Sequence, residues 1–391
     1  MPWSQPLTVL RLILLLMGSE FVRTGLLVSY LPIAAPSLGL SVTGVGLIFS
    51  AHYLADAVAK GPVGVLGERI GLGRILLLAT LLGGALLTLL HHTANLPLLT
   101  LVSVAWGLCY AALWPGVMAA AQHFARPGMT ARALAITSVA SVPPIVLGLV
   151  GVGQLMQRAA PLGYPVLLGV QVAALALALS VAGLRLPRTD QLSPAPVRRP
   201  LRERWGKVAT LLPAALAQTA APALLATVFY PLLAQTGLHL SQLIFPVGLG
   251  VVVGLGALWA ASRLADHTHP RAALTPGLLL LALTFFVGGL PDLGGHLLPF
   301  TLLGGAGYGC FIAGWNGLIG RTLPPEYRAA AWGTVMAVES AGTALGPLLG
   351  AFMWSRYGQA GVFWTGTALL LAVQAYYLWP GRAVTREREG A

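Results

Sequence analysis

Charged residues are scarce in this sequence: only 9% of its 391 residues are Asp, Glu, Lys or Arg, while 57% are hydrophobic. A soluble protein carries roughly 25% charged residues, which cover its surface in water. In a bilayer the outward-facing side chains can be apolar, so this requirement disappears. The shortage of charge therefore excludes a soluble globular protein and indicates a membrane protein.

Cysteine and cofactor motifs are also scarce. The two cysteines, Cys109 and Cys310, both lie inside apolar stretches, which excludes a disulfide framework and predicts no metal site. No G-x-x-x-x-G-K-[ST] loop occurs, so the sequence predicts no bound nucleotide and no other cofactor. The net charge of +12 does not indicate nucleic-acid binding, because the basic residues lie in short segments between apolar stretches.

Twelve apolar stretches are each long enough to cross a bilayer as a helix, which takes about 20 residues. Barrel strands would alternate polar and apolar residues, and these stretches do not. The predicted fold class is therefore an all-α membrane protein with twelve transmembrane helices. The stretches run near 10–32, 43–65, 74–92, 97–122, 133–156, 164–184, 208–234, 242–261, 272–290, 297–320, 329–353 and 361–379.

A polar, basic segment divides the twelve stretches into two groups of six. Nearly all Arg and Lys residues lie in this segment, in the loops after even-numbered stretches and in the C-terminal tail. By the positive-inside rule, both termini and the segment are cytoplasmic, in a multi-pass protein of the bacterial inner membrane. Binding of anionic lipid is the alternative role for the segment. The predicted divisions are an N-terminal six-helix bundle at 1–184, a cytoplasmic linker at 185–207, a C-terminal six-helix bundle at 208–380 and a tail at 381–391.

Two short segments between the stretches carry a family resemblance. Residues 64–74 read GVLGERIGLGR, and residues 262–271 read SRLADHTHPR. Both resemble the signature loop G-x-L-a-D-r-x-G-r of the major facilitator superfamily, with Glu68 in place of the usual Asp in the first copy. The resemblance implies two pseudo-symmetric six-helix bundles and secondary transport by alternating access. It also implies a cytoplasmic gating loop, whose residues here are Gly64, Glu68, Arg69, Gly71, Arg74 and Asp266.

Four charged residues lie inside the apolar stretches: Glu20, Arg23, Asp56 and Glu339. Each costs about 2.5–3.5 kcal/mol in mid-bilayer on insertion scales, so these side chains must face one another or water. Glu20 and Arg23 are three residues apart and share a helix face. A short loop joins the first two stretches, so we expect Asp56 to approach Arg23 in a cluster that lines the N-terminal half of a central cavity.

The Glu-x-x-Arg pattern followed by an Asp resembles proton-coupled members of the superfamily, including bacterial glycolipid flippases. Residues 342–350, GTALGPLLG, are similar to a motif of drug antiporters, although there it belongs to the fifth span rather than the eleventh. We therefore expect Glu20 or Asp56 to exchange a proton while Arg23 sets its affinity. A permanent ion pair that fixes helix packing is the alternative.

Other candidate side chains have two interpretations each. His52, Asp56 and Lys60 are four apart and form one stripe, in which His52 is either a relay or a hydrogen-bonding residue between helices. Glu339 is a second proton site, a substrate contact or a neutral acid bonded to a neighbouring helix. The remaining candidates either line the cavity or pack between helices, and they are the aromatic residues Trp106, Tyr110 and Trp114 and the C-terminal residues Gln218, Tyr230, Trp315 and Asn316.

The predicted function is secondary active transport of an amphipathic small molecule or lipid, coupled to protons as antiport. Drug export and glycolipid flipping remain equal alternatives, and a passive sugar or metabolite carrier is the next. A membrane-embedded lipid-modifying enzyme is the remote alternative, because the outer loops are too short and too uncharged to hold a catalytic cluster. We therefore predict no enzyme. The expected partners are an amphipathic substrate or glycolipid, protons and membrane lipids, with the chain as a monomer.

Overall fold

The described backbone is almost wholly helical. A computed structural model describes residues 2–126, 133, 136–137, 139–186, 208–322 and 328–378. In these ranges the only extended pairing is an isolated bridge between Trp3 and Ala125. The all-α class predicted from the sequence is therefore confirmed.

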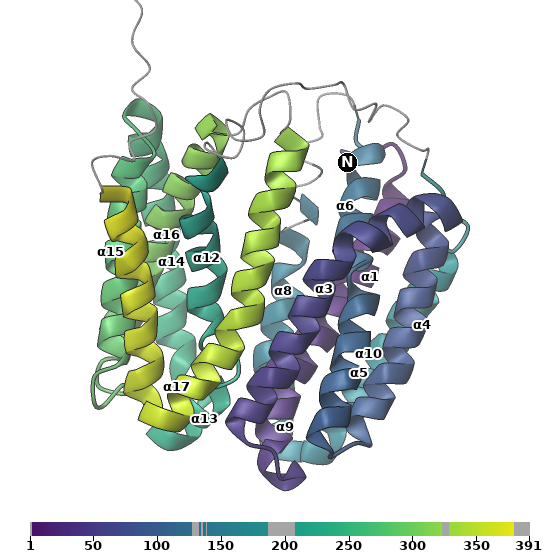
Figure 1. Cartoon of the computed structure of the whole chain (residues 1–391), viewed down its shortest axis with the longest axis horizontal. Helices are drawn as coiled ribbons and strands as arrows, with labels where there is room; N and C mark the ends of the chain where they lie inside the picture. Colours follow the sequence, from purple (N-terminus) through teal and green to yellow (C-terminus); the bar gives the residue numbers. More distant parts are fainter. Residues whose placement is uncertain are drawn as a thin grey trace, which may run out of the picture. The chain divides into compact units, whose positions relative to one another are not determined.

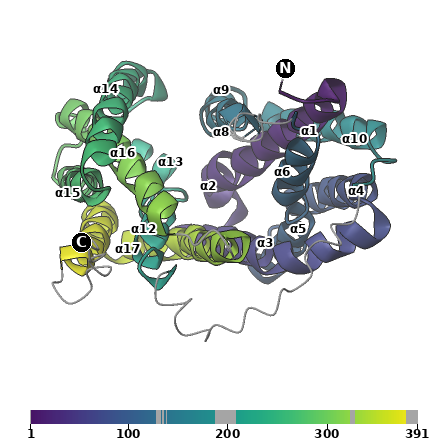
Figure 2. The same cartoon turned by 90° about the horizontal axis from the view of Figure 1, so that it is seen from above.

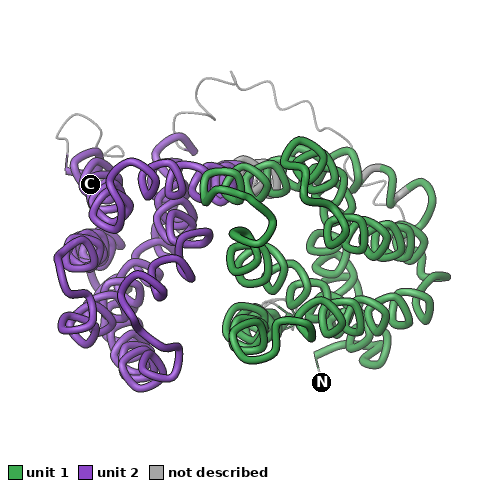
Figure 3. The backbone as a smooth tube through the Cα atoms, turned by 90° about the horizontal axis from the view of Figure 1, so that it is seen from below, with its two compact units in different colours: residues 1–195 green, residues 196–391 purple. Residues whose placement is uncertain are grey.

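The chain divides into two compact units, residues 1–195 and residues 196–391, which Figure 3 colours separately. The boundary between the units falls inside the segment 185–207, where the sequence analysis expects a linker. Most of that segment lies outside the described residues.

Unit 1 is a bundle of helices (Figure 1). Short π- or 3₁₀-helical segments, labelled η, interrupt two of its crossings, and a further one joins its last two helices. In chain order the elements are α1 (Pro6–Thr24), η1 (Gly25–Tyr30), α2 (Leu31–Ala34), η2 (Ala35–Leu38), α3 (Val42–Ile70), α4 (Leu72–His91), α5 (Leu96–Tyr110), α6 (Leu113–His123), α8 (Val142–Val146), η3 (Leu147–Gly151), α9 (Val152–Ala159), η4 (Ala160–Leu162) and α10 (Gly163–Ser180). Within the unit, α1 packs on α10, α3 on α5, and α4 on both α5 and α10.

Unit 2 has six labelled helices in the part of the chain that the structure describes, and the last of them is broken at Gly358. They are α12 (Leu212–Ala223), α13 (Phe229–Thr236), α14 (Leu240–His267), α15 (Arg271–Gly288), α16 (Leu297–Thr322) and α17 (Arg328–Leu378). Helix α16 packs on both α14 and α15, and α17 packs on both α12 and α15, as the view from above also shows (Figure 2).

Helix boundaries in unit 1 follow ordinary capping chemistry. The Ser41 side chain accepts a hydrogen bond from the backbone N–H of Gly44 and starts α3. Asn95 starts α5 in the same way, by accepting from the N–H of Leu98 at 3.1 Å. Both residues are preferred N-caps because they satisfy a backbone donor that the helix itself leaves free.

Nine helical segments in the described part of the chain are long and apolar enough to cross a membrane. Two of them, Val142–Ser180 with 39 residues and Val335–Leu378 with 44, are about twice the length that one crossing takes. The first is broken by η4 and the second by Gly358, whose φ is 62°. A multi-pass membrane protein is thus shown, while the count of twelve crossings stays a prediction.

The predicted stretch 208–234 needs correction. It is not one continuous helix, because a turn at residues 224–228 separates α12 from α13. Pro222 lies in the last turn of α12. A proline removes one backbone donor and crowds the carbonyl four residues before it, so Pro231, the third residue of α13, accounts for the break at 224–228.

The outer face of α14 shows what the bundle presents to its surroundings. Ile244, Phe245 and Val252 on this helix are all largely exposed, with 74% of Phe245 accessible. Large exposed apolar surface is abnormal for a soluble monomer and normal for a lipid-facing helix. The packing thus agrees with the membrane environment that the composition indicates.

Candidate functional site

The first pair of charges lies in the core of unit 1. Glu20 and Arg23 are three residues apart on α1, and Arg23 Nη2 donates to Glu20 Oε2 at 2.7 Å. Only 2% of Glu20 and 7% of Arg23 is accessible. A buried carboxylate is tolerated when a cation neutralises it and hydrogen bonds occupy its oxygens. Arg23 supplies the cation from within one helix turn and bonds one of the two carboxylate oxygens.

Helix α3 adds a second acid and a second cation, Asp56 and Lys60, beside Arg23. Arg23 Nη1 lies 3.7 Å from Asp56 Oδ2, and Lys60 Nζ lies 3.2 Å from the same oxygen. Asp56 is buried, whereas 29% of the Lys60 side chain is accessible. We call Glu20, Arg23, Asp56 and Lys60 the ionic cluster. It holds two carboxylates and two cations, so its charges balance when all four groups are ionised.

Aromatic side chains enclose the guanidinium of Arg23. Its Cζ atom lies 4.9 Å from the ring centre of Tyr53 and 5.3 Å from that of Tyr110. A cation near an aromatic face is attracted by the ring quadrupole, more strongly where water is excluded. Tyr110 is itself fixed, because its hydroxyl donates to the backbone oxygen of Ser19 at 2.9 Å. The enclosure therefore stabilises Arg23 in its charged form.

The two acids differ in their partners. Both oxygens of Glu20 are bonded, because Trp114 Nε1 donates to Oε1 at 2.9 Å while Arg23 occupies Oε2. Both ion-pair contacts of Asp56 use the single oxygen Oδ2, and the contact to Arg23 is the longer one. Arg23 also keeps an unused donor: its Nε is buried without a hydrogen-bond partner among the described residues. Asp56 is thus the more weakly held acid.

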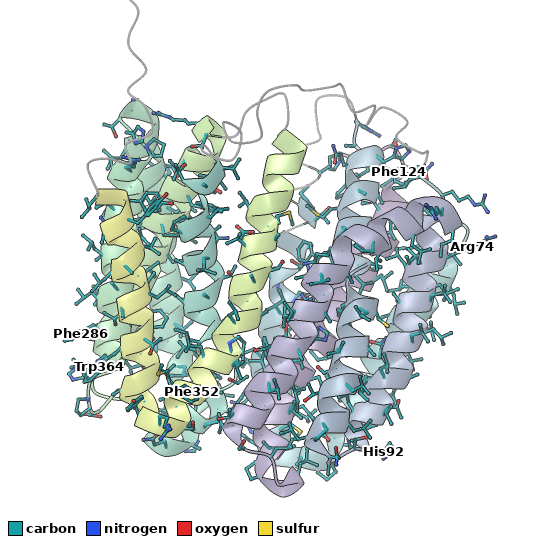
Figure 4. All side chains as sticks on the ribbon, viewed as in Figure 1. Arg74, His92, Phe124, Phe286, Phe352 and Trp364 are labelled. Atoms are coloured by element: carbon teal, nitrogen blue, oxygen red, sulfur yellow. The ribbon has the colours of Figure 1, made fainter. Side chains whose placement is uncertain are left out.

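The bond from Trp114 carries a testable expectation. Replacing Trp114 by Phe keeps an aromatic ring and removes only the N–H donor to Glu20. A hydrogen bond to a charged group contributes about 1.5–3 kcal/mol, and Trp114 is half-buried, so we expect a loss near the low end of that range. Thermal unfolding of the purified protein measures it. Trp364→Phe, at an exposed position on unit 2 (Figure 4), is the matched control; an equal shift in both variants would contradict the role of this bond.

His52 lies beside the ionic cluster but forms no ion pair with it. Its side chain is inaccessible and packs against Tyr53, Trp106 and Tyr110, with ring centres 4.7–5.4 Å apart. Neither ring nitrogen has a hydrogen-bond partner in the part of the chain that the structure describes. The stripe expected from the sequence therefore splits: Asp56 and Lys60 are paired, and His52 belongs to the aromatic packing.

The three aromatic candidates Trp106, Tyr110 and Trp114 also lie in different surroundings. Trp106 is inaccessible and lies in the core against His52, which agrees with the packing interpretation. Tyr110 and Trp114 contact the ionic cluster as described above. The helix that carries them is interrupted between α5 and α6, at residues 111–112, so the three rings do not continue one straight face.

In unit 2, Glu339 is bonded to a neighbouring helix. Gln218 Nε2 on α12 donates to Glu339 Oε1 at 3.3 Å, and the Thr219 hydroxyl donates to the backbone oxygen of Glu339 at 2.7 Å. These contacts agree with the third interpretation of Glu339. Tyr230 and Trp315 are buried, whereas Asn316 is exposed.

The expected gating segment is mostly helix. Helix α3 continues through Ile70, and Gly71 alone separates it from α4 with a φ of +100°. Glycine adopts this conformation without a steric penalty, so the whole turn fits into one residue. Gly64 is therefore helical rather than part of a loop, and Arg69 and Arg74 are exposed. The side chains of Glu68 and Asp266 lie outside what the structure describes.

Arg321 is a residue that the sequence analysis missed. Its guanidinium donates to the backbone oxygens of Ala265 at 3.3 Å and Thr268 at 3.4 Å, and so caps the C-terminal end of α14. A cation there stabilises the carbonyls that end the helix. Partial burial, together with the positive charges of Arg271 and Arg321, lowers the pKa of the nearby His269. The position of Arg321, at the end of an apolar stretch opposite the second signature segment, is the signal that could have indicated it.

Tyr53 was also missed, although its spacing gave a signal. It is three residues before Asp56, so both side chains share a face of α3. A second group without an assigned role joins three helices at the opposite end of unit 1: the Tyr30 hydroxyl lies 2.7 Å from His91 Nδ1, and the His91 ring stacks on Tyr164. No local spacing connects these three residues, which lie on three different helical segments.

Comparison with known proteins agrees with this architecture. The chain is 21% identical to the proton-coupled antiporter flippase LtaA of Staphylococcus aureus (strain USA300) over 392 residues, which cover 97% of this chain and 96% of that protein. It is also 21% identical to the LtaA of Staphylococcus saprophyticus over 358 residues, covering 88% of this chain and 86% of that one.

Solved structures share the fold. A bacterial homolog of the human lysosomal transporter Spinster, inward-facing and unoccupied, has a TM-score of 0.76 at 15% identity and covers 95% of this chain and 96% of its own. The nucleoside transporter NupG has a TM-score of 0.73 at 11% identity and covers 95% of this chain and 99% of its own.

The family profile matches nearly the whole chain. It is described as Major Facilitator Superfamily and aligns with residues 12–294 and 261–391. Together with the apolar helices, this match makes the chain a multi-pass transporter of a bacterial membrane rather than an enzyme. The chain belongs to the Major Facilitator Superfamily.

Proposed function

We propose that this transporter is a proton-coupled antiporter that moves an amphipathic lipid across the inner membrane. The observation that carries the proposal is the ionic cluster, in which two buried acids compete for one arginine. Protonation of either acid leaves Arg23 to the other acid, while Lys60 stays beside Asp56. Such a competition links proton binding to a change in the contacts between α1 and α3.

Asp56 is the acid to which we assign the exchangeable proton. Its ion pairs use one oxygen, and its distance to Arg23 is 3.7 Å, whereas Glu20 is bonded at both oxygens. Protonation of Asp56 removes the attraction between α3 and Arg23 and leaves the pair on α1 intact. The two helices then lose an electrostatic tie that returns when the proton leaves, as alternating access requires.

The substrate assignment rests on the relatives. The proteins that this chain resembles over nearly its whole length are named antiporter flippases, which favours a lipid over a soluble drug. A lipid with a polar, glycosylated head group fits an N-terminal half that mixes charges with aromatic rings. We therefore propose a glycolipid flippase activity, with membrane lipid and protons as the partners and the monomer as the working unit.

Topology and gating belong to the same proposal. The basic segment 185–207 is the cytoplasmic linker between bundles 1–184 and 208–380, and both termini are cytoplasmic, as the positive-inside rule predicts. In this orientation the turn at Gly71 and the cap at Arg321 lie on the cytoplasmic side. Exposed Arg69 and Arg74 beside that turn are available for contacts that form and break during transport.

Reconstituted liposomes with an imposed pH gradient test the function. We expect a gradient to accelerate the movement of a fluorescent glycolipid, and Asp56→Asn to reduce the rate to that without a gradient, because the amide takes up no proton. Glu20→Gln should weaken the response, since it frees Arg23 from one of its two acids. A cationic dye, measured in parallel, separates lipid flipping from drug export.

The matched control is Asp292→Asn, the same chemical change at an exposed acid whose side chain accepts from the backbone of Gly295. It should leave the response unchanged. The proposal of proton coupling fails if both Glu20→Gln and Asp56→Asn respond to the gradient as the unchanged protein does. Glu339→Gln tests whether the second unit holds a proton site. If Glu339 exchanges a proton, this variant loses part of the response to the pH gradient.

A further inference from the structure

Unit 1 contains a cavity of about 450 Å³ that is separate from the ionic cluster. It lies between the end of the first crossing, the end of α4 and the start of α10, and its wall includes Tyr30, Ser37, His91, Met156 and Tyr164. Figure 4 shows the neighbouring His92 at the end of the unit opposite Arg74 and Phe124. Pockets of this size accommodate a small ligand or a lipid head group.

One wall of the cavity is a polar group held in a fixed geometry. The Tyr30 hydroxyl and His91 Nδ1 are 2.7 Å apart, and the Tyr164 hydroxyl donates to Thr88 at 3.0 Å. The rings of His91 and Tyr164 are stacked 3.8 Å apart and only 2° from parallel. We call Tyr30, His91 and Tyr164 the aromatic wall. Side chains from η1, α4 and α10 thus form one wall, in which the His91 and Tyr164 rings are stacked and the Tyr30 ring is tilted by 58° to His91.

The backbone behind the aromatic wall departs from regular α-helix. Tyr30 is the last residue of the π-helical segment η1, and η1 packs against a second π-helical segment, η3. The Ser29 hydroxyl joins them through the backbone oxygens of Gly148, at 3.0 Å, and Leu149, at 2.8 Å. π-Helical turns are rare and frequently lie at functional sites, because they redirect side chains out of helical register.

The cavity wall restricts the charge of a ligand. Its lining residues include no Asp, Glu, Lys or Arg, so an ion would leave water without a counter-charge. His91 uses only Nδ1 for hydrogen bonding within the described residues, which leaves Nε2 for a ligand. Hydroxyl and imidazole groups both donate and accept, as a polyol requires. Apolar side chains such as Met156 and Pro161 complete the wall and suit the apolar face of a sugar or the start of an acyl chain.

We propose that the cavity binds the uncharged, hydroxyl-rich head group of a membrane amphiphile at the outer surface of the inner membrane. The head group lies against the aromatic wall and hydrogen-bonds to Tyr30 and His91. The inference rests on the proposed function in two respects: the amphiphile is of the transported class, and the proposed orientation places this end of unit 1 outside. It adds a second binding site, which shares no residue with the ionic cluster and at which a head group resides before or after transport.

Photo-crosslinking in phosphatidylcholine nanodiscs tests the site with the full chain. The probe is octyl β-glucoside with a diazirine on the first carbon of its chain, and the comparison probe is octyl phosphocholine with the same diazirine. We expect the glucoside to label the peptides that contain Met156 and Tyr164, and octyl phosphocholine to label them far less. Tyr30→Phe should reduce labelling by about fivefold, the effect of losing one hydrogen bond. Tyr164→Leu, which also removes the stacked ring, should reduce it further.

Controls separate this site from the transport mechanism. Tyr357→Leu, at a position that is 68% exposed in unit 2, should leave labelling unchanged. Asp56→Asn should also leave it unchanged while removing the response to a pH gradient, so the two proposals fail separately. Equal labelling by octyl phosphocholine would show an acyl-chain pocket and overturn the inference, as would labelling that survives Tyr164→Leu in folded protein. Complete competition by free glucose would overturn the assignment to a membrane amphiphile.

Discussion

Replacing Arg23 by Met is expected to destabilise the protein by about 3–5 kcal/mol, the usual effect of removing one partner from a buried ion pair. The substitution keeps most of the side-chain volume but leaves Glu20 and Asp56 buried without the cation that lies between them. Lys60 remains beside Asp56 and lessens the effect at that acid. Glu20 keeps only the Trp114 hydrogen bond, so most of the loss arises there.

The unfolding midpoint in detergent measures this effect, by heat or by titration with a denaturing detergent. Arg74→Met is the matched control, because Arg74 is exposed and its loss should change stability by less than about 0.5 kcal/mol. A triple variant, Glu20→Gln, Arg23→Met and Asp56→Asn, should recover much of the stability, since it leaves no unpaired carboxylate. If Arg23→Met were as stable as the unchanged protein, the cluster would be hydrated and the electrostatic account of the site would be wrong.

The sequence predicted part of the ionic cluster from two features: the spacing of Glu20 and Arg23 on one helix, and the short loop between the first two crossings. Glu20 and Arg23 are three apart, and any helix places them on one face. The approach of Asp56 followed from the short connection between the first two crossings. The partners of these groups depend on how α3, α5 and α6 are rotated about their axes, which no local spacing determines. The bond from Trp114 to Glu20 was therefore beyond reach, whereas Tyr53 could have been found from its place on the Asp56 face of α3.

The same limit applies to the aromatic residues and to the signature segment. Trp106 and Trp114 have equivalent spacing on one apolar stretch, yet the break between α5 and α6 turns them to different neighbours, one in the core and one at the cluster. The signature segment was expected to be a loop because it lies between two apolar stretches and resembles a signature loop of the family. One glycine with positive φ is sufficient for the turn, so the helix could continue to Ile70. Hydropathy indicates that a segment is apolar, but not how few residues a turn takes.

The second large effect expected is at a helix crossing in unit 2. A Cβ atom added at Gly305 on α16 would overlap the backbone oxygen of Gly250 on α14. No side-chain rotation relieves this contact, because the obstacle is backbone, so the two helices must separate. Gly254 and Gly309 meet in the same crossing, where small residues spaced by four allow close approach. Gly305→Ala should therefore cost about 3 kcal/mol, the upper part of the range for overpacked contacts.

Gly256→Ala on the same helix pair is the control that makes this expectation specific. A Cβ atom at Gly256 meets nothing within 4 Å, so its only effect is the better helix propensity of alanine, worth up to about 1 kcal/mol in the stabilising direction. The two substitutions are chemically identical, and they should shift the unfolding midpoint in opposite directions. If both shift it equally, α14 and α16 are not in backbone contact. A transporter of this family moves its helices against one another, and a crossing fixed by backbone contact is one that moves as a rigid pair.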